Sequence, residues 1–230
     1  MNNNETLIAV SFLLAFLASP VSAGVMDPVS DDEINRAKTM AMARASSATV
    51  VARRSLRSAD AEQQVSAAPT VEYLRVQPHR FEKSEISANK RWADTTAYDY
   101  TTNELITTVI DLDNNQVIST ERNRNMQPPM VESEIQRAIE IVFQDDEERS
   151  ILNTEFSRIT GQTLTSVDQL QYKAFTFFSD SMPNVVNNAS QACGAQRCAQ
   201  LMLYTHDNIV FEVSPIVNLS AGVVTQRMGY

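Results

Sequence analysis

Histidine, glycine and cysteine are all scarce in this chain of 230 residues. Only His79 and His206 are present, so a metal centre with three histidine ligands cannot form within one copy of the chain. The 5 glycines form neither a Gly-x-Ser-x-Gly nucleophile elbow nor a glycine-rich phosphate-binding loop. These shortages exclude the catalytic and nucleotide-binding motifs that are easiest to find in a sequence.

Positive charge is also in short supply, because 19 Lys and Arg against 28 Asp and Glu leave a net charge of −9. An acidic chain is a poor partner for nucleic acid and for anionic membrane surfaces. Small molecules, cations and other proteins remain as partners. The acidic run Asp145–Glu148 lacks the alternating oxygen ligands and central glycine of an EF-hand, so we interpret it as a solvated turn and not as a calcium loop.

Long hydrophobic runs are absent except near the amino terminus, where apolar residues extend from Leu7 to Leu17 and small residues follow to Ala23. This arrangement is typical of a secretory signal peptide with its cleavage site. We expect a signal peptide at residues 1–23, cleavage after Ala23, a mature chain beginning at Gly24 and a secreted or periplasmic location. An uncleaved membrane anchor is the alternative, although the run is shorter than the ~20 apolar residues that a span needs.

The two cysteines, Cys193 and Cys198, enclose only four residues. In an exported chain the oxidising environment favours a disulfide between them. Because the closed loop is short, the chain-entropy model gives it only about 2 kcal/mol of stabilisation. We expect the bond to act locally, at the start of the strand that follows. A redox or metal role is the alternative, and the missing Cys-x-x-Cys spacing argues against it.

Two short segments occur twice, about a hundred residues apart. Glu33–Ala37 returns as Glu134–Ala138, and Ile110–Ser119 returns, one residue shorter, as Val217–Thr225. The copies keep their order, so the simplest interpretation is a duplicated domain. We place the first domain at residues 24–126 and the second at residues 127–230.

Each proposed domain begins with a helix. Ser30–Glu33 fits a capping box that starts the first helix. This helix fades into an Ala/Ser/Arg segment at residues 44–58, which fits either frayed helix or linker. The second helix has its apolar residues at helical spacing, at Ile135, Ala138, Ile139 and Val142. A further helix is predicted from Asp146 to Gly161.

Strands are predicted from runs of β-branched and aromatic residues. They lie at residues 71–76, 92–100, 104–112, 116–121, 171–178, 199–206, 209–219 and 223–226. Asp113–Asn115 and Ser220–Gly222 suit hairpin turns because Asn and Gly accept positive φ. Paired carboxylates such as Asp111 and Asp113 are interpreted as turn residues. The predicted fold class is therefore α+β, with two tandem rolls that each pack a helix on an antiparallel sheet.

Several of these segments together resemble the small amino-terminal domains of copper amine oxidases. The segments that carry the resemblance are Val109–Leu112, Gln116–Ser119, Met126–Met130 and the helix containing Glu134-Ile135. The resemblance covers roughly residues 25 to 230 and implies two tandem cystatin-like α+β domains. The segment around Cys193 and Cys198 resembles a feature of stand-alone secreted members of this group.

The resemblance implies no enzyme in this chain. In that family the copper-binding histidines and the quinone-forming Tyr, within an Asn-Tyr-Asp/Glu motif, belong to a separate catalytic domain. Here Tyr98-Asp99 follows Ala97, so the motif is not met. We expect no catalytic residue, no cofactor and no metal. The expected function is a non-catalytic exported binding or accessory module with a protein partner, with a homodimer through sheet edges or the convex sheet face as an option, and with no nucleic acid and no stable membrane insertion.

Two alternatives remain open. The first is a copper-handling or oxidase-escort protein, because His206, Met202 and the cysteines are near in sequence and offer soft ligands for Cu(I). A disulfide would compete with that site, and His206 fits an exposed or hydrogen-bonded strand residue. His79 follows Pro78 and has no acidic or cysteine neighbour in the sequence. The second alternative is a cystatin-type protease inhibitor, because Gln63–Ala67 approaches Gln-x-Val-x-Gly but ends in Ala67.

Overall fold

The computed structural model describes residue 24 and residues 27–55, 70–83 and 90–229. These residues form an α+β structure with three α-helices and two antiparallel four-stranded sheets. The predicted signal peptide at residues 1–23 and the Gln63–Ala67 segment lie outside the described residues. We refer to residues 24–126 as the first half of the chain and to residues 127–230 as the second half.

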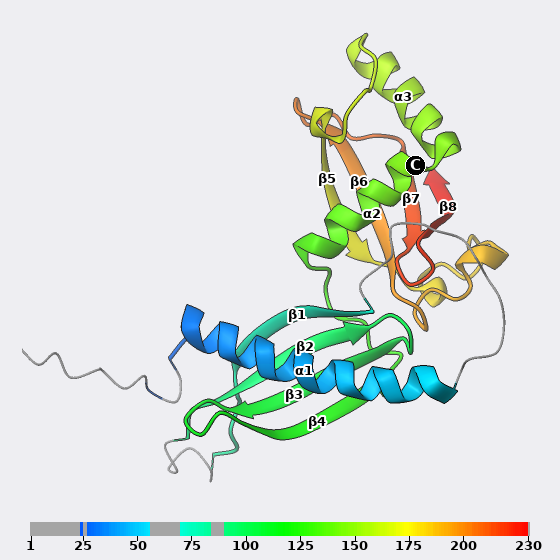
Figure 1. Cartoon of the computed structure of the whole chain (residues 1–230). Coiled ribbons are helices and arrows are strands. Elements are labelled where there is room, and N and C mark those ends of the chain that lie inside the picture. Colours follow the sequence, from blue (N-terminus) through cyan, green and yellow to red (C-terminus); the bar gives the residue numbers. More distant parts are fainter. Residues whose placement is uncertain (1–23, 25–26, 56–69, 84–89, 230) are drawn as a thin grey trace, which may run out of the picture.

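The first half consists of one long helix laid across one sheet. Helix α1 spans Asp31–Ser55, and the sheet order follows the sequence, with β1 at Val71–Pro78, β2 at Trp92–Asp99, β3 at Glu104–Asp111 and β4 at Gln116–Arg124. Figure 1 shows α1 crossing the face of these strands. The buried side of α1 is lined by small residues, Ala37, Ala41 and Ala45. Small side chains let the helix lie close to the apolar sheet residues Ala93, Ala97, Ile106 and Ile110.

The second half repeats the order of one helix and four strands with insertions. Helix α2 (Glu132–Gln144) contacts all four strands β5 (Leu170–Thr176), β6 (Cys198–Thr205), β7 (Val213–Asn218) and β8 (Val223–Gly229). Helix α3 (Asp146–Thr160) follows α2 directly. Short 3-10 helices lie at η2 (Val167–Gln169), η3 (Ser179–Ser181) and η4 (Asn188–Ser190). Figure 1 shows α2 across this sheet and α3 beyond it.

Helix ends and turns form where the sequence predicted them. Ser30 donates its backbone N–H to Glu33 Oε2 at 2.8 Å, and the Glu33 N–H donates to Ser30 Oγ, as in a capping box. Gly161 ends α3 in the left-handed region at φ 71. Asn115 and Gly222, in the two predicted hairpin turns, also have positive φ, at 52 and 70.

Two expectations need correction, and one alternative that the sequence left open is decided. Asp145–Glu148 is not a solvated turn: Asp145 caps α3 by accepting from the N–H groups of Glu147 and Glu148, and the Glu148 side chain is buried. Segment 44–58 is helical as far as Ser55, so it is not a linker over that range. The strand predicted at 209–219 begins only at Val213, because Val210 makes an isolated bridge to Tyr204.

The two hairpins β3–β4 and β7–β8 share an irregularity at corresponding places. In the first hairpin the register shifts by one residue between Val109 and Ile110, and in the second it shifts between Ile216 and Val217. Both shifts lie at the segments that recur in the sequence.

The largest apolar cluster crosses from one half to the other. Residues of the first half, Leu74, Tyr98, Tyr100 and Leu105, pack with residues from α2, α3 and the second sheet. The halves are therefore joined by a common apolar interior as well as by the chain. None of the helices in the described part of the chain has the length and hydropathy needed to cross a membrane.

Candidate functional site

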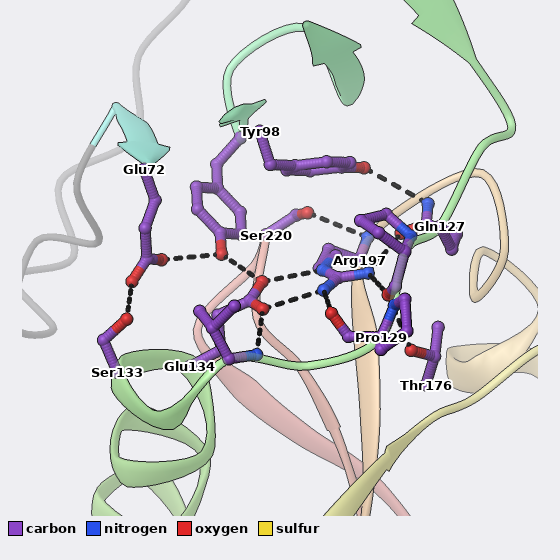
Figure 2. A network of polar contacts seen from close by, with 12 residues as sticks. Glu72, Tyr98, Gln127, Pro129, Ser133, Glu134, Thr176, Arg197 and Ser220 are labelled. Carbon is purple, nitrogen blue, oxygen red and sulfur yellow. Dashed lines mark hydrogen bonds and ion pairs between the residues drawn. The ribbon is translucent and has the colours of Figure 1, made fainter. Parts of the chain in front are cut away.

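The most heavily built polar site lies between the two halves, around a fully buried ion pair. Arg197, just before β6, donates from Nε to Glu134 Oε1 and from Nη2 to Glu134 Oε2, each at 2.7 Å. Both side chains are 0% exposed. Two parallel bonds between a guanidinium and a carboxylate give the strongest form of such a pair. Figure 2 shows the pair at the centre of the network.

The remaining donors of Arg197 hold the segment that connects the halves. Nη1 donates to Gln127 Oε1 at 3.3 Å and to Pro128 O at 2.6 Å, and Nη2 donates to Pro129 O at 3.2 Å. With the two bonds to Glu134, all five N–H groups of the guanidinium are used. Glu134 Oε2 also accepts from the Val131 N–H at 3.0 Å. We call this set of contacts the Arg197 clamp.

The Arg197 clamp continues into the first half through Tyr100. The Tyr100 hydroxyl lies 2.7 Å from Glu134 Oε1 and 2.8 Å from Glu72 Oε2. Glu72, on β1, also accepts from Ser133 Oγ and from Arg137 Nη1, both on α2. Two carboxylates and two guanidinium groups therefore balance each other across the junction, and Figure 2 shows Glu72, Ser133 and Glu134 on this path.

Burial shapes the protonation of this network. Burial, followed by the charge of Glu134, raises the pKa of Tyr100 far above its usual value, so the phenol keeps its proton and acts as a donor. Burial alone would raise the pKa of Glu72 too. Hydrogen bonds from Ser133 and Arg137 outweigh that effect and hold the pKa of Glu72 below its usual value. The contacts of Glu72 thus favour its ionised carboxylate at neutral pH.

A second clamp in the first half uses the same bonds. Arg91, just before β2, donates from Nε and Nη2 to the two oxygens of Glu33, each at 2.9 Å. Its Nη1 donates to Gly24 O at 2.9 Å and Asp27 O at 2.7 Å, and its Nη2 donates to Pro28 O at 2.8 Å. All five donors are again used. We call this set the Arg91 clamp.

The two clamps also occupy the same place in their sheets. The Arg91 carbonyl accepts from the Leu112 N–H, and the Arg197 carbonyl accepts from the Leu219 N–H, each at 2.8 Å. The hydrogen bonds from Arg91 are the main cause that lowers the pKa of Glu33 to about 2. Each clamp therefore connects the start of a helix, and the segment before that helix, to the arginine that precedes the second strand of the sheet.

Neither clamp offers the chemistry of an active site. Every donor of both guanidinium groups is already bonded within the fold, so a ligand could bind only by displacing an existing bond. Within the described residues, no serine, cysteine or histidine side chain is hydrogen-bonded to either ion pair as a nucleophile or base; Ser30 contacts Glu33 as a helix cap. Each arrangement stabilises a chain path and does not present a reactive group.

The predicted disulfide is present between Cys193 and Cys198, the first residue of β6. Its sulfurs are oxidised, so they offer no thiolate to a Cu(I) ion. Among the described residues, no three His, Cys, Asp or Glu side chains come together in a way that could hold a metal ion.

His206 lies exposed just after β6, where its Nε2 contacts Asp168 O at 2.9 Å. It lines an open cleft of about 480 Å³ near the end of α3. Its lining includes apolar Phe156, Ile159 and Ile209 and acidic Asp168 and Asp207.

His79 has an acidic neighbour in the structure that its sequence neighbours did not indicate. Its Nδ1 lies 2.5 Å from Asp94 Oδ1, so it does have an acidic neighbour. The reason is the antiparallel pairing of β1 with β2, which sets Gln77 opposite Asp94. His79 also packs beside the rings of Phe81 and Trp92, with centroids 4.8 and 5.5 Å away. Sequence neighbours alone could not indicate this contact.

The clamp residues were missed as functional candidates in the sequence. The sequence places Glu33 and Glu134 in a repeated segment at helix starts, and their partners Arg91 and Arg197 lie 58 and 63 residues away. Each arginine stands two residues before a fully buried alanine, Ala93 or Ala199, of the second strand in its sheet, but burial and strand order are known only from the structure, so the sequence offered no signal for these pairs.

Comparisons with known proteins show a likeness to solved structures alone. No protein-family model matches the sequence, and no curated protein matches it. Among solved structures, a copper-containing benzylamine oxidase from Hansenula polymorpha is similar, with a TM-score of 0.49 and 10% sequence identity. The similarity covers 90% of this chain but only 30% of the oxidase chain. It assigns neither an activity nor a family to this protein.

Proposed function

We propose that this protein is an exported, non-catalytic binding or accessory module made of two tandem copies of a cystatin-like α+β roll. The observation that carries the proposal is the pair of clamps. Arg91 bonds Glu33 through the same two nitrogen atoms by which Arg197 bonds Glu134. Each arginine also bonds two carbonyls before its helix at corresponding positions, Asp27 and Pro28 in the first half and Pro128 and Pro129 in the second. The carbonyl of each arginine accepts a backbone N–H from the corresponding leucine.

Duplication explains why the same bonds recur. An ion pair buried at zero or near-zero exposure is costly unless every bond is made, so independent appearance of two such sets would require many matched residues. A copied domain carries the set with it. The corresponding register shifts near Ile110 and Val217 support the same interpretation, because they extend the match from the clamps into the β3–β4 and β7–β8 hairpins.

The use of the polar groups supports a non-catalytic role. The fully buried charges of Arg197 and Glu134, and the buried charges of Arg91 and Glu33, are consumed in holding helix starts and the connection between the halves. An interaction protein needs such a rigid scaffold and an accessible surface, and it does not need perturbed reactive groups.

Strand β4 is the surface that we assign to the partner. It is an edge strand, and its exposed side chains include the apolar residues Val117 and Ile118. An exposed edge presents unpaired backbone groups to an added strand, and apolar side chains next to it would be covered in the complex. A protein partner, or a second copy of this chain, would bind there.

The test uses the chain from Gly24 to Tyr230 as an immobilised bait for the extracellular fraction of its own source. Ile118→Lys should lose at least 10-fold of the recovered partner, whereas Val185→Lys, at an exposed apolar residue of the second half, should not. Light scattering of the purified protein measures whether it forms a homodimer, and Ile118→Lys should dissociate such a dimer.

Equal recovery with both variants, or hydrogen peroxide release from primary amines by the purified protein, would contradict the proposal. Stoichiometric copper in the purified protein would favour the copper-handling alternative, and inhibition of papain would favour the protease inhibitor.

A further inference from the structure

Gly24 is held at both of its backbone polar atoms. Its carbonyl oxygen accepts from Arg91 Nη1 at 2.9 Å and from the Asp27 N–H at 3.1 Å. Its nitrogen lies 2.6 Å from Asp27 Oδ2. The residue directly after the predicted cleavage site is therefore fixed in the Arg91 clamp, with a carboxylate at its nitrogen.

The close approach of this carboxylate depends on glycine. A Cβ atom at position 24 would lie 3.2 Å from Asp27 Oδ2, tighter than an ordinary contact. Glycine leaves room for the Asp27 carboxylate to reach the nitrogen without moving. A carboxylate at this distance is a suitable partner for an ammonium group, which carries a full positive charge, and a weaker partner for a neutral amide.

The Arg197 clamp fills the corresponding place differently. There the donor Nη1 bonds a side chain, Gln127 Oε1, where Arg91 bonds the main chain of Gly24. In the second half the chain arrives from β4 through this region, so the clamp holds a continuous segment. In the first half the corresponding donor, Arg91 Nη1, bonds the carbonyl of Gly24, and the nitrogen of Gly24 lies next to the Asp27 carboxylate.

From this geometry we propose that Gly24 is the amino-terminal residue of the exported protein, with Asp27 and Arg91 as the binding site for its new terminus. A leader peptidase would hydrolyse the bond between Ala23 and Gly24. The C–N bond breaks, the hydroxyl of water joins the Ala23 carbonyl carbon, and one hydrogen of water with one solvent proton completes the Gly24 ammonium group. The contact with Asp27 then becomes an ion pair, so processing completes the Arg91 clamp at the start of α1.

The first measurement is the intact mass and amino-terminal sequence of the protein exported by its own source. The second is a double-mutant cycle on residues 24–230, with the terminus free or acetylated and with Asp27 or Asp27→Asn. At low ionic strength, acetylation should lower the Tm by about 2 °C when Asp27 is present and by less than half as much in Asp27→Asn. Asp207→Asn, which removes a carboxylate exposed in the second half, should leave the effect of acetylation unchanged.

A second readout does not depend on stability. An amine-acylating reagent should modify the Gly24 amine several-fold more slowly in the Asp27 protein than in Asp27→Asn, because the ion pair holds the amine in its unreactive ammonium form. A first residue other than Gly24 would overturn the proposal. So would an effect of acetylation, or a rate of acylation, that is the same with Asp27 and with Asn at position 27.

Discussion

At the scale of single residues, the buried pair of Arg197 and Glu134 shows how a charge can be tolerated in the interior. Taking both charges out of water costs several kcal/mol, and only complete bonding offsets that cost. Here the guanidinium has five partners and the carboxylate has the Val131 N–H and Tyr100 as well. The pair therefore sets the path of the connecting segment more than it adds net stability.

Breaking this pair on one side should be far worse than removing both partners. We expect Arg197→Met to lower the free energy of unfolding by about 3–5 kcal/mol, because Glu134 is left buried and unpaired. The double variant Glu134→Gln with Arg197→Met should recover a large part of that loss. Urea unfolding followed by circular dichroism measures both.

The matched control for that experiment is Arg124→Met, which breaks the pair with Glu104 at an arginine side chain that is 72% exposed. It should cost less than about 1 kcal/mol. Equal losses in Arg124→Met and Arg197→Met would contradict the importance of burial.

The Glu33–Arg91 pair should make stability depend on acid pH. The pKa of Glu33 is lowered to about 2 in the folded protein, below its usual value of 4.5. A depressed folded pKa contributes stability that is complete above pH 4.5 and is lost as the pH falls towards 2. Glu33→Gln should therefore flatten the decline of the free energy of unfolding over that range, and Glu121→Gln, an exposed carboxylate of β4, should leave its slope unchanged.

At the scale of elements, local chemistry decides where helices stop. Gly161 ends α3 at φ 71, and a Cβ there would meet nothing within 4 Å. The cost of a side chain at this position is thus purely conformational. We expect Gly161→Ala to destabilise the protein by roughly 1 kcal/mol and Gly161→Asn by less, because Asn tolerates the left-handed region better. Thermal unfolding of the two variants checks this order, and an equal Tm for Ala and Asn would contradict it.

Elements with local signals were predictable from the sequence, and contacts between distant elements were not. The capping box at Ser30, the turn at Asn115 and the end of α3 at Gly161 each depend on residues within one turn of the chain. The bonds from Arg91 to Glu33 and from His79 to Asp94 depend on which strand lies beside which. Alternation within one strand contains no information on that pairing, so these partners could not be assigned.

At the scale of the whole molecule, the shared apolar cluster should make the two halves unfold together. Leu105 of β3 packs in the cluster that includes Leu152 and Phe211 of the second half. Trp92 is the sole tryptophan and lies in the first half, so its fluorescence reports that half, while far-ultraviolet circular dichroism reports both. We expect the two urea transitions to coincide, which is the mark of a two-state transition.

Two variants test whether the halves also unfold together when the shared cluster, or a cluster confined to the first half, is weakened. Leu105→Ala and Ile106→Ala should each cost about 2–5 kcal/mol and should each keep the two transitions coincident. A fluorescence transition that precedes the circular dichroism transition in wild type would show that the halves unfold separately.

The distance along the chain between clamp partners has a consequence for biosynthesis. Glu33 pairs with an arginine 58 residues later in the chain, and Glu134 pairs with one 63 residues later. The ribosome synthesises each glutamate before its arginine partner. Neither helix start can therefore reach its final buried arrangement until the second strand of its sheet has emerged. Neither clamp can therefore form early in synthesis, which would suit the export that we propose for this protein.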